Sequence, residues 1–91
     1  MSVKIVLPAD LIIYTGGKAE VQVKGGTVGK ALAELVKRFP GIGTLILGKD
    51  GSLLADVDIY VNRERCFPNP LVKPLNSGDE LHVIVYTFIG G

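Results

Sequence analysis

The sequence ends on Gly90 and Gly91, and this end carries the strongest chemical signal in the chain. A terminal carboxyl group has a pKa of roughly 3.3–3.7, so it is ionised at neutral pH and can attack the α-phosphate of ATP. The adenylated carboxyl group is then an acyl donor. Because glycine has no Cβ atom, a Gly-Gly end can thread a narrow enzyme cleft. The alternative is an ordinary terminus, since most chain ends are disordered and have no function.

The chain has one cysteine, Cys66, and one histidine, His82. A thiol nucleophile needs a base, and His82 would serve only if the fold brings it close to Cys66. One cysteine excludes an internal disulfide, and a zinc site built on one cysteine and one histidine would need carboxylates to complete it. We expect an unreactive thiol at Cys66 and no metal site.

Two glycine-containing segments share features with nucleotide-binding motifs but do not fulfil them. In residues 25–30, Lys24 stands where a phosphate loop has its first glycine, and Ala31 stands where it has the magnesium-binding Ser or Thr. Residues 41–44, Gly-Ile-Gly-Thr, lack the third glycine and the preceding strand of a dinucleotide fingerprint. We interpret both segments as turns beside a helix.

Length, charge and hydropathy exclude several classes of protein. A chain of 91 residues allows one domain, and its formal net charge of +1 gives no strong field to attract nucleic acid or a membrane surface. No apolar run approaches the ~20 residues that cross a bilayer. The first eight residues lack the apolar stretch of a secretory signal. We expect a cytoplasmic location, with neither nucleic acid nor a membrane as partner.

The N-terminal third predicts a β-hairpin followed by a helix. Val3, Ile5 and Leu7 alternate along a first strand, and residues 20–24 alternate along a second, after a turn at residues 15–18. Thr27 is a good N-cap for the helix, which Pro40-Gly41 ends. Its apolar stripe consists of Val28, Ala31, Leu32, Leu35, Val36 and Phe39. On its opposite face we expect i,i+4 ion pairs of Glu34 with Lys30 and with Arg38.

The rest of the chain predicts two further strands in an irregular setting. Residues 44–47 are apolar and short, and periodicity alone leaves helix and strand both open. Residues 57–61 alternate as a strand, residues 62–65 form a polar bend, and the two prolines of residues 67–70 exclude regular structure. After a turn at residues 76–79, residues 80–88 form the last strand.

This order of elements predicts an α+β roll, with one main helix packed on one face of a mixed sheet of four to five strands. The first and last strands are both apolar on one face, so a pairing between them at the sheet centre would be parallel. We assign residues 1–87 to the domain and residues 88–91 to a flexible tail.

A row of side chains should face away from the helix. If Leu81, Val83 and Val85 point to the core, then alternation along the strand turns the residues between them outward. The outward row consists of His82, Ile84 and Tyr86, with Tyr60 from the neighbouring strand. Such a row indicates a partner surface. Two alternatives stay open: scattered apolar groups are normal on a small domain, or the irregular middle segment covers them.

With these elements assigned, the sequence resembles the ThiS/MoaD family of sulfur carriers, which are relatives of ubiquitin with a β-grasp fold. The resemblance rests on the helix and its Phe-Pro-Gly exit at residues 27–41 and on Ile-Tyr-Val-Asn at residues 59–62. It continues in Pro-Leu-Asn-Ser-Gly-Asp-Glu-Leu at residues 74–81 and ends at Gly90-Gly91. Many members have prolines shortly before the Gly-Gly, whereas this chain has Tyr-Thr-Phe-Ile at residues 86–89.

The resemblance implies a carrier rather than an enzyme. A ubiquitin-activating-type adenylyltransferase would use ATP to adenylate Gly91, and a sulfur donor would convert the acyl-adenylate to a thiocarboxylate. Phe88, Ile89 and Gly90 would enter the partner's cleft, with a reach of about 13 Å from Phe88 to Gly91. The carrier itself would bind no cofactor, and an acceptor enzyme, such as a synthase large subunit, would take the sulfur.

The resemblance leaves the destination of the sulfur open. Molybdopterin or tungstopterin synthesis ranks first, and the length of the chain fits such members and the cysteine-pathway members better than the shorter thiamine-type carriers. Sulfur delivery to cysteine, homocysteine or thiamine thiazole ranks next. Conjugation of Gly91 to a lysine of another protein is a different class of function, and a plain interaction domain with an incidental Gly-Gly end is a third.

Overall fold

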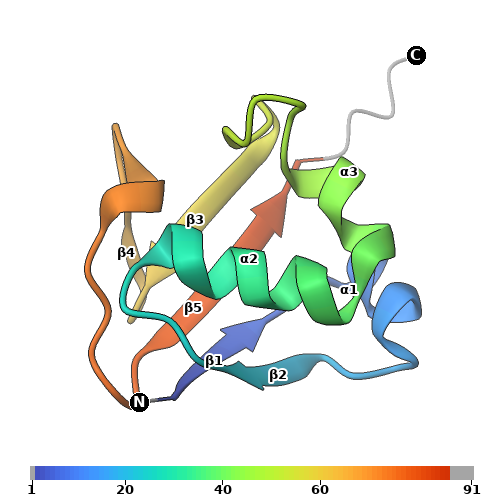
Figure 1. The fold of residues 1–91 in the computed structure, drawn as a ribbon, viewed down its shortest axis with the longest axis horizontal. Helices are drawn as coiled ribbons and strands as arrows, with labels where there is room; N and C mark the ends of the chain where they lie inside the picture. Colours follow the sequence, from blue (N-terminus) through green and yellow to red (C-terminus); the bar gives the residue numbers. More distant parts are fainter. Residues whose placement is uncertain (1, 87–91) are drawn as a thin grey trace.

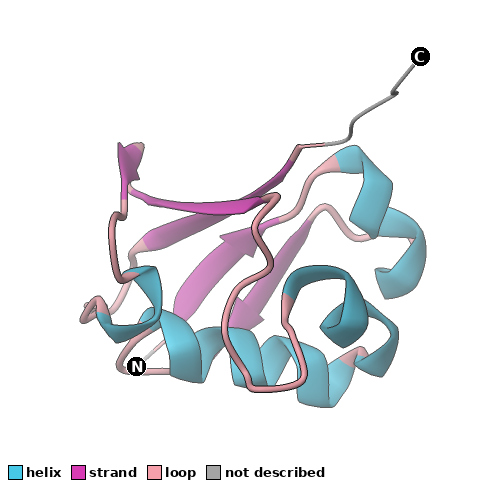
Figure 2. Ribbon diagram, turned by 90° about the horizontal axis from the view of Figure 1, so that it is seen from above, coloured by secondary structure: helices cyan, strands magenta, loops and turns pink. Residues whose placement is uncertain are grey.

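The computed structural model describes residues 2–86, which form one five-stranded sheet with helices on one side (Figures 1 and 2). The strands are β1 (Val3–Val6), β2 (Glu20–Val23), β3 (Val57–Val61), β4 (Glu64–Arg65) and β5 (Glu80–Val85). The α-helices are α1 (Ala9–Ile12), α2 (Val28–Arg38) and α3 (Gly43–Ile46), and 3₁₀ turns cover Ile13–Thr15, Pro40–Ile42 and Pro70–Val72. The predicted α+β roll is confirmed.

The sheet has the strand order β2-β1-β5-β3-β4, with the first and last strands paired at its centre. β1 and β5 run parallel, with Ile5 opposite Leu81, and the other three pairings are antiparallel. The predicted N-terminal hairpin and the predicted parallel centre are therefore both present.

Helix α2 crosses the sheet and begins where the sequence predicts (Figure 1). The Thr27 hydroxyl oxygen accepts a hydrogen bond from the Lys30 amide at 3.2 Å, which satisfies one of the free amides of the first turn. At the other end, the Phe39 amide still donates to the Leu35 carbonyl, and Pro40 then starts a 3₁₀ turn.

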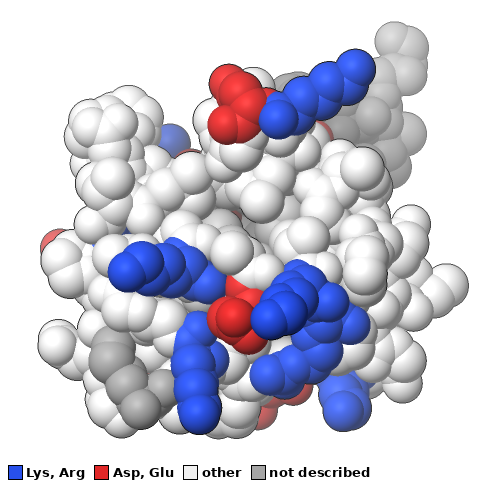
Figure 3. Space-filling view, viewed as in Figure 1, with Lys and Arg blue, Asp and Glu red and all other residues white. Residues whose placement is uncertain are grey.

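The expected ion pairs on α2 are wrong. Among the described residues, no ion pair within 4 Å joins Glu34 to Lys30 or to Arg38, although basic side chains gather around an acidic one on this face (Figure 3). The guanidinium of Arg38 instead donates through Nη1 to the carbonyl oxygen of Gln22, at 2.9 Å. Gln22 lies on edge strand β2. The Arg38 cation is therefore bound to a backbone carbonyl at the sheet edge and not to Glu34, the partner that the helix spacing predicts.

The middle of the chain is helical before it turns back to the sheet. Residues 43–46 form α3, and Leu47 then makes an isolated bridge with Leu53, so the open choice between helix and strand is resolved as helix. The predicted polar bend is more regular than expected, because Glu64 and Arg65 form β4. A two-residue turn joins β3 to β4, with φ of 50° at Asn62 and 70° at Arg63, the mirror-image turn that suits a hairpin.

The last strand is shorter than predicted. β5 ends at Val85, and Tyr86 follows it without regular structure. The remaining predicted strand positions, residues 87–88, lie outside the described residues, and so does the proposed boundary between the domain and its tail.

One hydrophobic core fills the space between α2 and the sheet. Val3, Ile5, Leu81 and Val83 are buried in it as predicted, whereas Val85 at the end of β5 is only partly buried. The α2 side chains with less than 2 % exposure are Val28, Ala31, Leu32 and Leu35. Within the described part of the chain, no helix has the length and apolar character to span a bilayer.

A close backbone approach at Gly25 generates the first prediction. A Cβ atom at Gly25 would lie 2.6 Å from the Ala31 amide nitrogen, whereas one at Gly26 would have no atom within 4 Å. We expect Gly25→Ala to lower the free energy of unfolding by roughly 1–3 kcal/mol, because helix backbone cannot yield as a side chain can. Urea unfolding followed by circular dichroism measures this difference.

The matched control is Gly26→Ala, which we expect to change the free energy of unfolding by about 0.5 kcal/mol or less. Equal effects of the two substitutions would show that the β2 to α2 connection tolerates a side chain at Gly25.

Candidate functional site

The outward row predicted from the sequence is assembled on the sheet face opposite α2. The strand register puts Tyr60 opposite His82, and both of them line a shallow hollow of about 340 Å³. The five side chains that line it, Tyr60, Arg63, His82, Ile84 and Tyr86, are named here the outer-face patch. The structure thus brings the four predicted residues together, and their role in binding a partner stays a prediction.

None of the side chains that line the outer-face patch comes from a helix, and the main helix α2 lies on the opposite face of the sheet (Figure 2). The irregular middle segment, the other candidate cover, packs against the core through Leu47, Leu53 and Leu54. Tyr86 is 47 % exposed, whereas Tyr60, His82 and Ile84 are partly buried by one another and by their neighbours. The patch is therefore an open, partly apolar surface.

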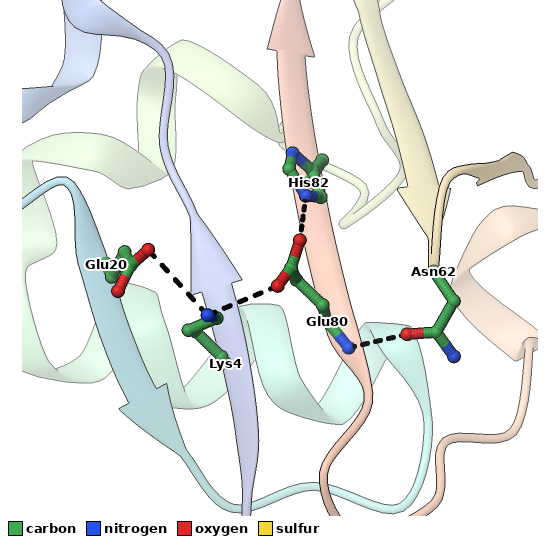
Figure 4. A network of polar contacts seen from close by, with 5 residues as sticks. All are labelled: Lys4, Glu20, Asn62, Glu80 and His82. Carbon is green, nitrogen blue, oxygen red and sulfur yellow. Dashed lines mark hydrogen bonds and ion pairs between the residues drawn. The ribbon is translucent and has the colours of Figure 1, made fainter.

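An ionic network borders the patch on the side of β1 and β2 (Figure 4). Lys4 lies between two carboxylates, with its Nζ atom 3.2 Å from Glu80 and 3.7 Å from Glu20. The other carboxylate oxygen of Glu80 lies 2.5 Å from Nε2 of His82. The backbone of Glu80 is fixed as well, because its amide donates to the Asn62 side-chain oxygen at 3.0 Å. The His82 ring is thereby held in one orientation at the patch border.

This network shifts the pKa values of its members. The hydrogen bond from His82, followed by that from Lys4, lowers the pKa of Glu80 below its ordinary value. The hydrogen bond with Glu80 and the charge of Glu20 raise the pKa of Lys4. Glu80 is thus an orienting carboxylate for the His82 ring. Glu80 precedes it by two residues, so both side chains leave β5 on the same face.

A second polar cluster borders the patch on the side of β3 and β4. Asp58 accepts hydrogen bonds from the Tyr86 hydroxyl at 3.0 Å and from Arg65 at 3.3 Å. Asp58 and Arg65 were not predicted as site residues, although Asp58 precedes Tyr60 by two positions on one strand, which is the signal that marks it. Arg63 was missed as well, because its place in the patch depends on the positive φ angles of the β3 to β4 turn.

The fold keeps Cys66 and His82 apart. Cys66 packs against the core on the α2 side of the sheet, and its thiol contacts the Glu64 carbonyl oxygen at 3.8 Å. His82 lines the opposite face. A thiol nucleophile with His82 as its base is therefore excluded by the geometry.

The glycine-rich segment before α2 is a packed turn rather than an anion site. Gly25 lies against the backbone of Ala31, and Leu75 donates its amide to the Gly26 carbonyl oxygen. In the part of the chain that the structure describes, no three His, Cys, Asp or Glu side chains gather as metal ligands.

The C-terminal residues that the sequence singled out, Phe88, Ile89, Gly90 and Gly91, lie outside the described residues. Tyr86 is the last described residue and lines the outer-face patch. The chain therefore continues toward its Gly-Gly end directly from the border of the patch.

The chain is similar to known proteins in its sequence, although no family model matches it. The sulfur carrier protein CysO of Mycobacterium tuberculosis is 30 % identical over 87 residues, which cover 92 % of this chain and 94 % of the relative. The chain belongs to the ThiS/MoaD family of ubiquitin-like sulfur carriers.

Solved structures agree with this membership of the sulfur-carrier family. The crystal structure of SAMP1 from Haloferax volcanii is 31 % identical to the carrier, with a TM-score of 0.85 and full coverage of both chains. The structure of the BexX/CysO complex of Amycolatopsis orientalis matches with 28 % identity and a TM-score of 0.87, over 97 % of the carrier and 99 % of that chain. The expectation of a carrier rather than an enzyme is confirmed by these relatives.

The ionic network of the carrier leads to a prediction on pH. Because the folded-state pKa of Glu80 lies below its ordinary value of about 4.3, ionised Glu80 stabilises the fold above that pH. The contribution is lost as the pH falls through the lower folded-state value. We expect a ¹³C titration of the Glu80 carboxyl group to give this low pKa.

Two variants test what lowers the pKa of Glu80. His82→Ala and Lys4→Met should each raise the pKa of Glu80, because the hydrogen bond from His82, followed by that from Lys4, lowers it. An ordinary Glu80 pKa in the wild-type protein, or no change in either variant, would contradict this assignment.

Proposed function

We propose that the C-terminal carboxylate of Gly91 is the sulfur-bearing group of this carrier. A carboxylate oxygen attacks the α-phosphate of ATP on an activating enzyme and releases pyrophosphate. A sulfur nucleophile from the donor then displaces AMP and leaves a thiocarboxylate at Gly91. The observation that carries this proposal is the position of the outer-face patch, which adjoins the last described residue before the Gly-Gly end in a member of a sulfur-carrier family.

The carrier and its partners have different roles in this mechanism. The core and α2 support the sheet from one side, and the outer-face patch on its other side supplies an apolar centre for docking. The charged borders, with Lys4 and Glu80 on one side and Asp58 and Arg65 on the other, supply the polar rim that typically fixes the register of a complex. The activating enzyme contributes the nucleotide site, and the carrier contributes no catalytic side chain.

Sulfur delivery to cysteine, homocysteine or thiamine thiazole is the destination that we now rank first. Its support is the 30 % identity to the sulfur carrier protein CysO of Mycobacterium tuberculosis and the 28 % identity to the CysO complex structure of Amycolatopsis orientalis. A putative molybdopterin converting factor subunit of Pyrococcus furiosus is 23 % identical, a likeness that extends to the fold alone. Molybdopterin or tungstopterin synthesis, ranked first from the sequence, therefore becomes the second destination.

Protein modification is the second candidate function. Its support is the similarity to SAMP1 of Haloferax volcanii, a structure described as a small archaeal modifier protein 1, at 30–31 % identity. In this reaction a lysine amine displaces AMP from the same Gly91 adenylate, so both functions use one activated terminus and differ only in the nucleophile.

The proposed chemistry predicts a change in intact mass. Incubation of the carrier with its native activating enzyme, ATP and a sulfide source should yield a species heavier by the difference between sulfur and oxygen. Fragmentation should locate the change at Gly91, and hydrolysis should reverse it. Mass spectrometry under denaturing conditions also separates the two functions, because conjugation gives adducts of protein size.

The control is a chain with one alanine appended after Gly91, which should stay unmodified because its terminal carboxylate no longer fits the end of the cleft. An unmodified wild-type chain in the complete mixture, or modification of the extended chain, would contradict the proposed role of Gly91.

Docking through the outer-face patch predicts a strong effect at its centre. Ile84→Asp puts a charge where the complex has to exclude water, so we expect the Kd for the activating enzyme to rise at least about 30-fold, the loss typical of a binding hot spot. Isothermal titration calorimetry without ATP measures this Kd. Circular dichroism of the variant checks that its fold is intact.

The matched control for Ile84 is Ala33→Asp, the same charge on the exposed face of α2. It should change the Kd by less than about threefold, since rim and remote charges contribute little. Comparable losses at both positions would indicate that the sheet face is not the docking surface.

A further inference from the structure

The last described residue of the carrier is held at two points, one on β3 and one on the residue just before that strand. The Tyr86 amide donates to the Asp56 carbonyl oxygen at 2.8 Å, which fixes the backbone where β5 ends. The Tyr86 hydroxyl donates to Oδ2 of Asp58 at 3.0 Å, which fixes the side chain. Asp58 of β3 and Asp56, which directly precedes that strand, therefore hold the point from which residues 87–91 continue.

The acceptor of this hydrogen bond is itself held in place. Oδ1 of Asp58 accepts from Nε and Nη2 of Arg65, both at 3.3 Å, and the Asp58 side chain is only 17 % exposed. The Arg65 guanidinium lies over the Phe67 ring, 4.9 Å from its centroid. A chain of contacts thus runs from the loop after β4 to the Tyr86 hydroxyl.

The Tyr86 hydroxyl stays protonated in this arrangement. The hydrogen bond to Asp58, together with partial desolvation and the carboxylate charge, raises the pKa of Tyr86 above its ordinary value. A phenolate beside a carboxylate would be repelled. The hydroxyl therefore keeps its proton and remains the donor in this contact with the carboxyl group of Asp58.

The position set at Tyr86 matters because Gly91 follows it by only five residues. Residues 87–91 contain no proline, the residue that would fix a backbone angle, and they end in two glycines. Five residues span at most about 17 Å. The point at which the backbone leaves the domain therefore limits where Gly91 can meet a nucleotide site on a docked partner.

We propose that Tyr86 and Asp58 form a positioning pair, which fixes the direction in which residues 87–91 leave the domain once the carrier has docked. Arg65 supports the pair by orienting the carboxylate. The pair stabilises the domain little, because Tyr86 is 47 % exposed and lies outside the core. This inference rests on the proposed function, and it adds Asp58 and Arg65 to the residues that serve the reaction without touching the reacting atoms.

The deciding variant is Tyr86→Phe, which removes the hydroxyl and keeps the ring in the outer-face patch. ATP–pyrophosphate exchange by the activating enzyme at saturating carrier should fall about three- to tenfold, because fewer docked chains present Gly91 productively. This loss at saturating carrier should be larger than any rise in the Kd measured without ATP. Asp58→Asn keeps an acceptor for the hydroxyl and should retain at least half of the wild-type exchange rate.

A structural measurement tests the pair without the enzyme. The ¹⁵N heteronuclear NOE of the Tyr86 amide should fall in Tyr86→Phe and in Asp58→Ala, because the side-chain anchor is lost in both. The control is Asp58→Asn, which keeps a side-chain oxygen as acceptor for the hydroxyl and should leave the NOE close to the wild-type value.

The outcomes are separable. A wild-type carrier that supports no exchange overturns the proposed function, and the positioning role with it. A wild-type carrier that is activated while Tyr86→Phe is equally fast overturns the positioning role alone. A Kd that rises in parallel with the loss of exchange also overturns it, because the hydroxyl then acts in docking.

Discussion

The central strand β5 is the constraint on which the rest of the structure depends. It pairs with β1 on one side and β3 on the other, so its side chains have only the two faces of the sheet available. Leu81 and Val83 enter the core under α2, and this burial fixes the register. The same alternation forces His82 and Ile84 onto the opposite face. The core and the outer-face patch are therefore two sides of one strand, and a shift of one residue would destroy both.

Most of the fold could be predicted because its signals are local. Alternation identified β1, β2, β3 and β5, helical spacing identified α2, and the prolines identified the loop after Cys66. The errors concern elements that only tertiary contacts decide. β4 exists because a two-residue turn brings Glu64 opposite Val61, and Arg38 leaves its helical partner because the Gln22 carbonyl oxygen is within reach. Neither the formation of β4 nor the partner of Arg38 can be predicted from a local sequence pattern.

The candidate site was predicted in part for the same reason. Tyr60, His82, Ile84 and Tyr86 follow from alternation along two strands, and their adjacency follows from strand order. Their polar partners require the register as well as the order. Asp58 reaches Tyr86 only because β3 and β5 are aligned with Asp58 opposite Ile84, and Lys4 reaches Glu80 across the parallel pair. Sequence reasoning thus finds the apolar centre of a surface more readily than its charged border.

The bond from Arg38 to the edge strand has a consequence for self-association. An exposed sheet edge is a template for adding a strand from another molecule, and β2 and β4 are the two edges here. Arg38 occupies the Gln22 carbonyl of β2, and β4 is only two residues long, so each edge offers an added strand fewer backbone partners. Edge-to-edge pairing with a second copy is thereby disfavoured, and the faces of the sheet are left for contacts with other molecules.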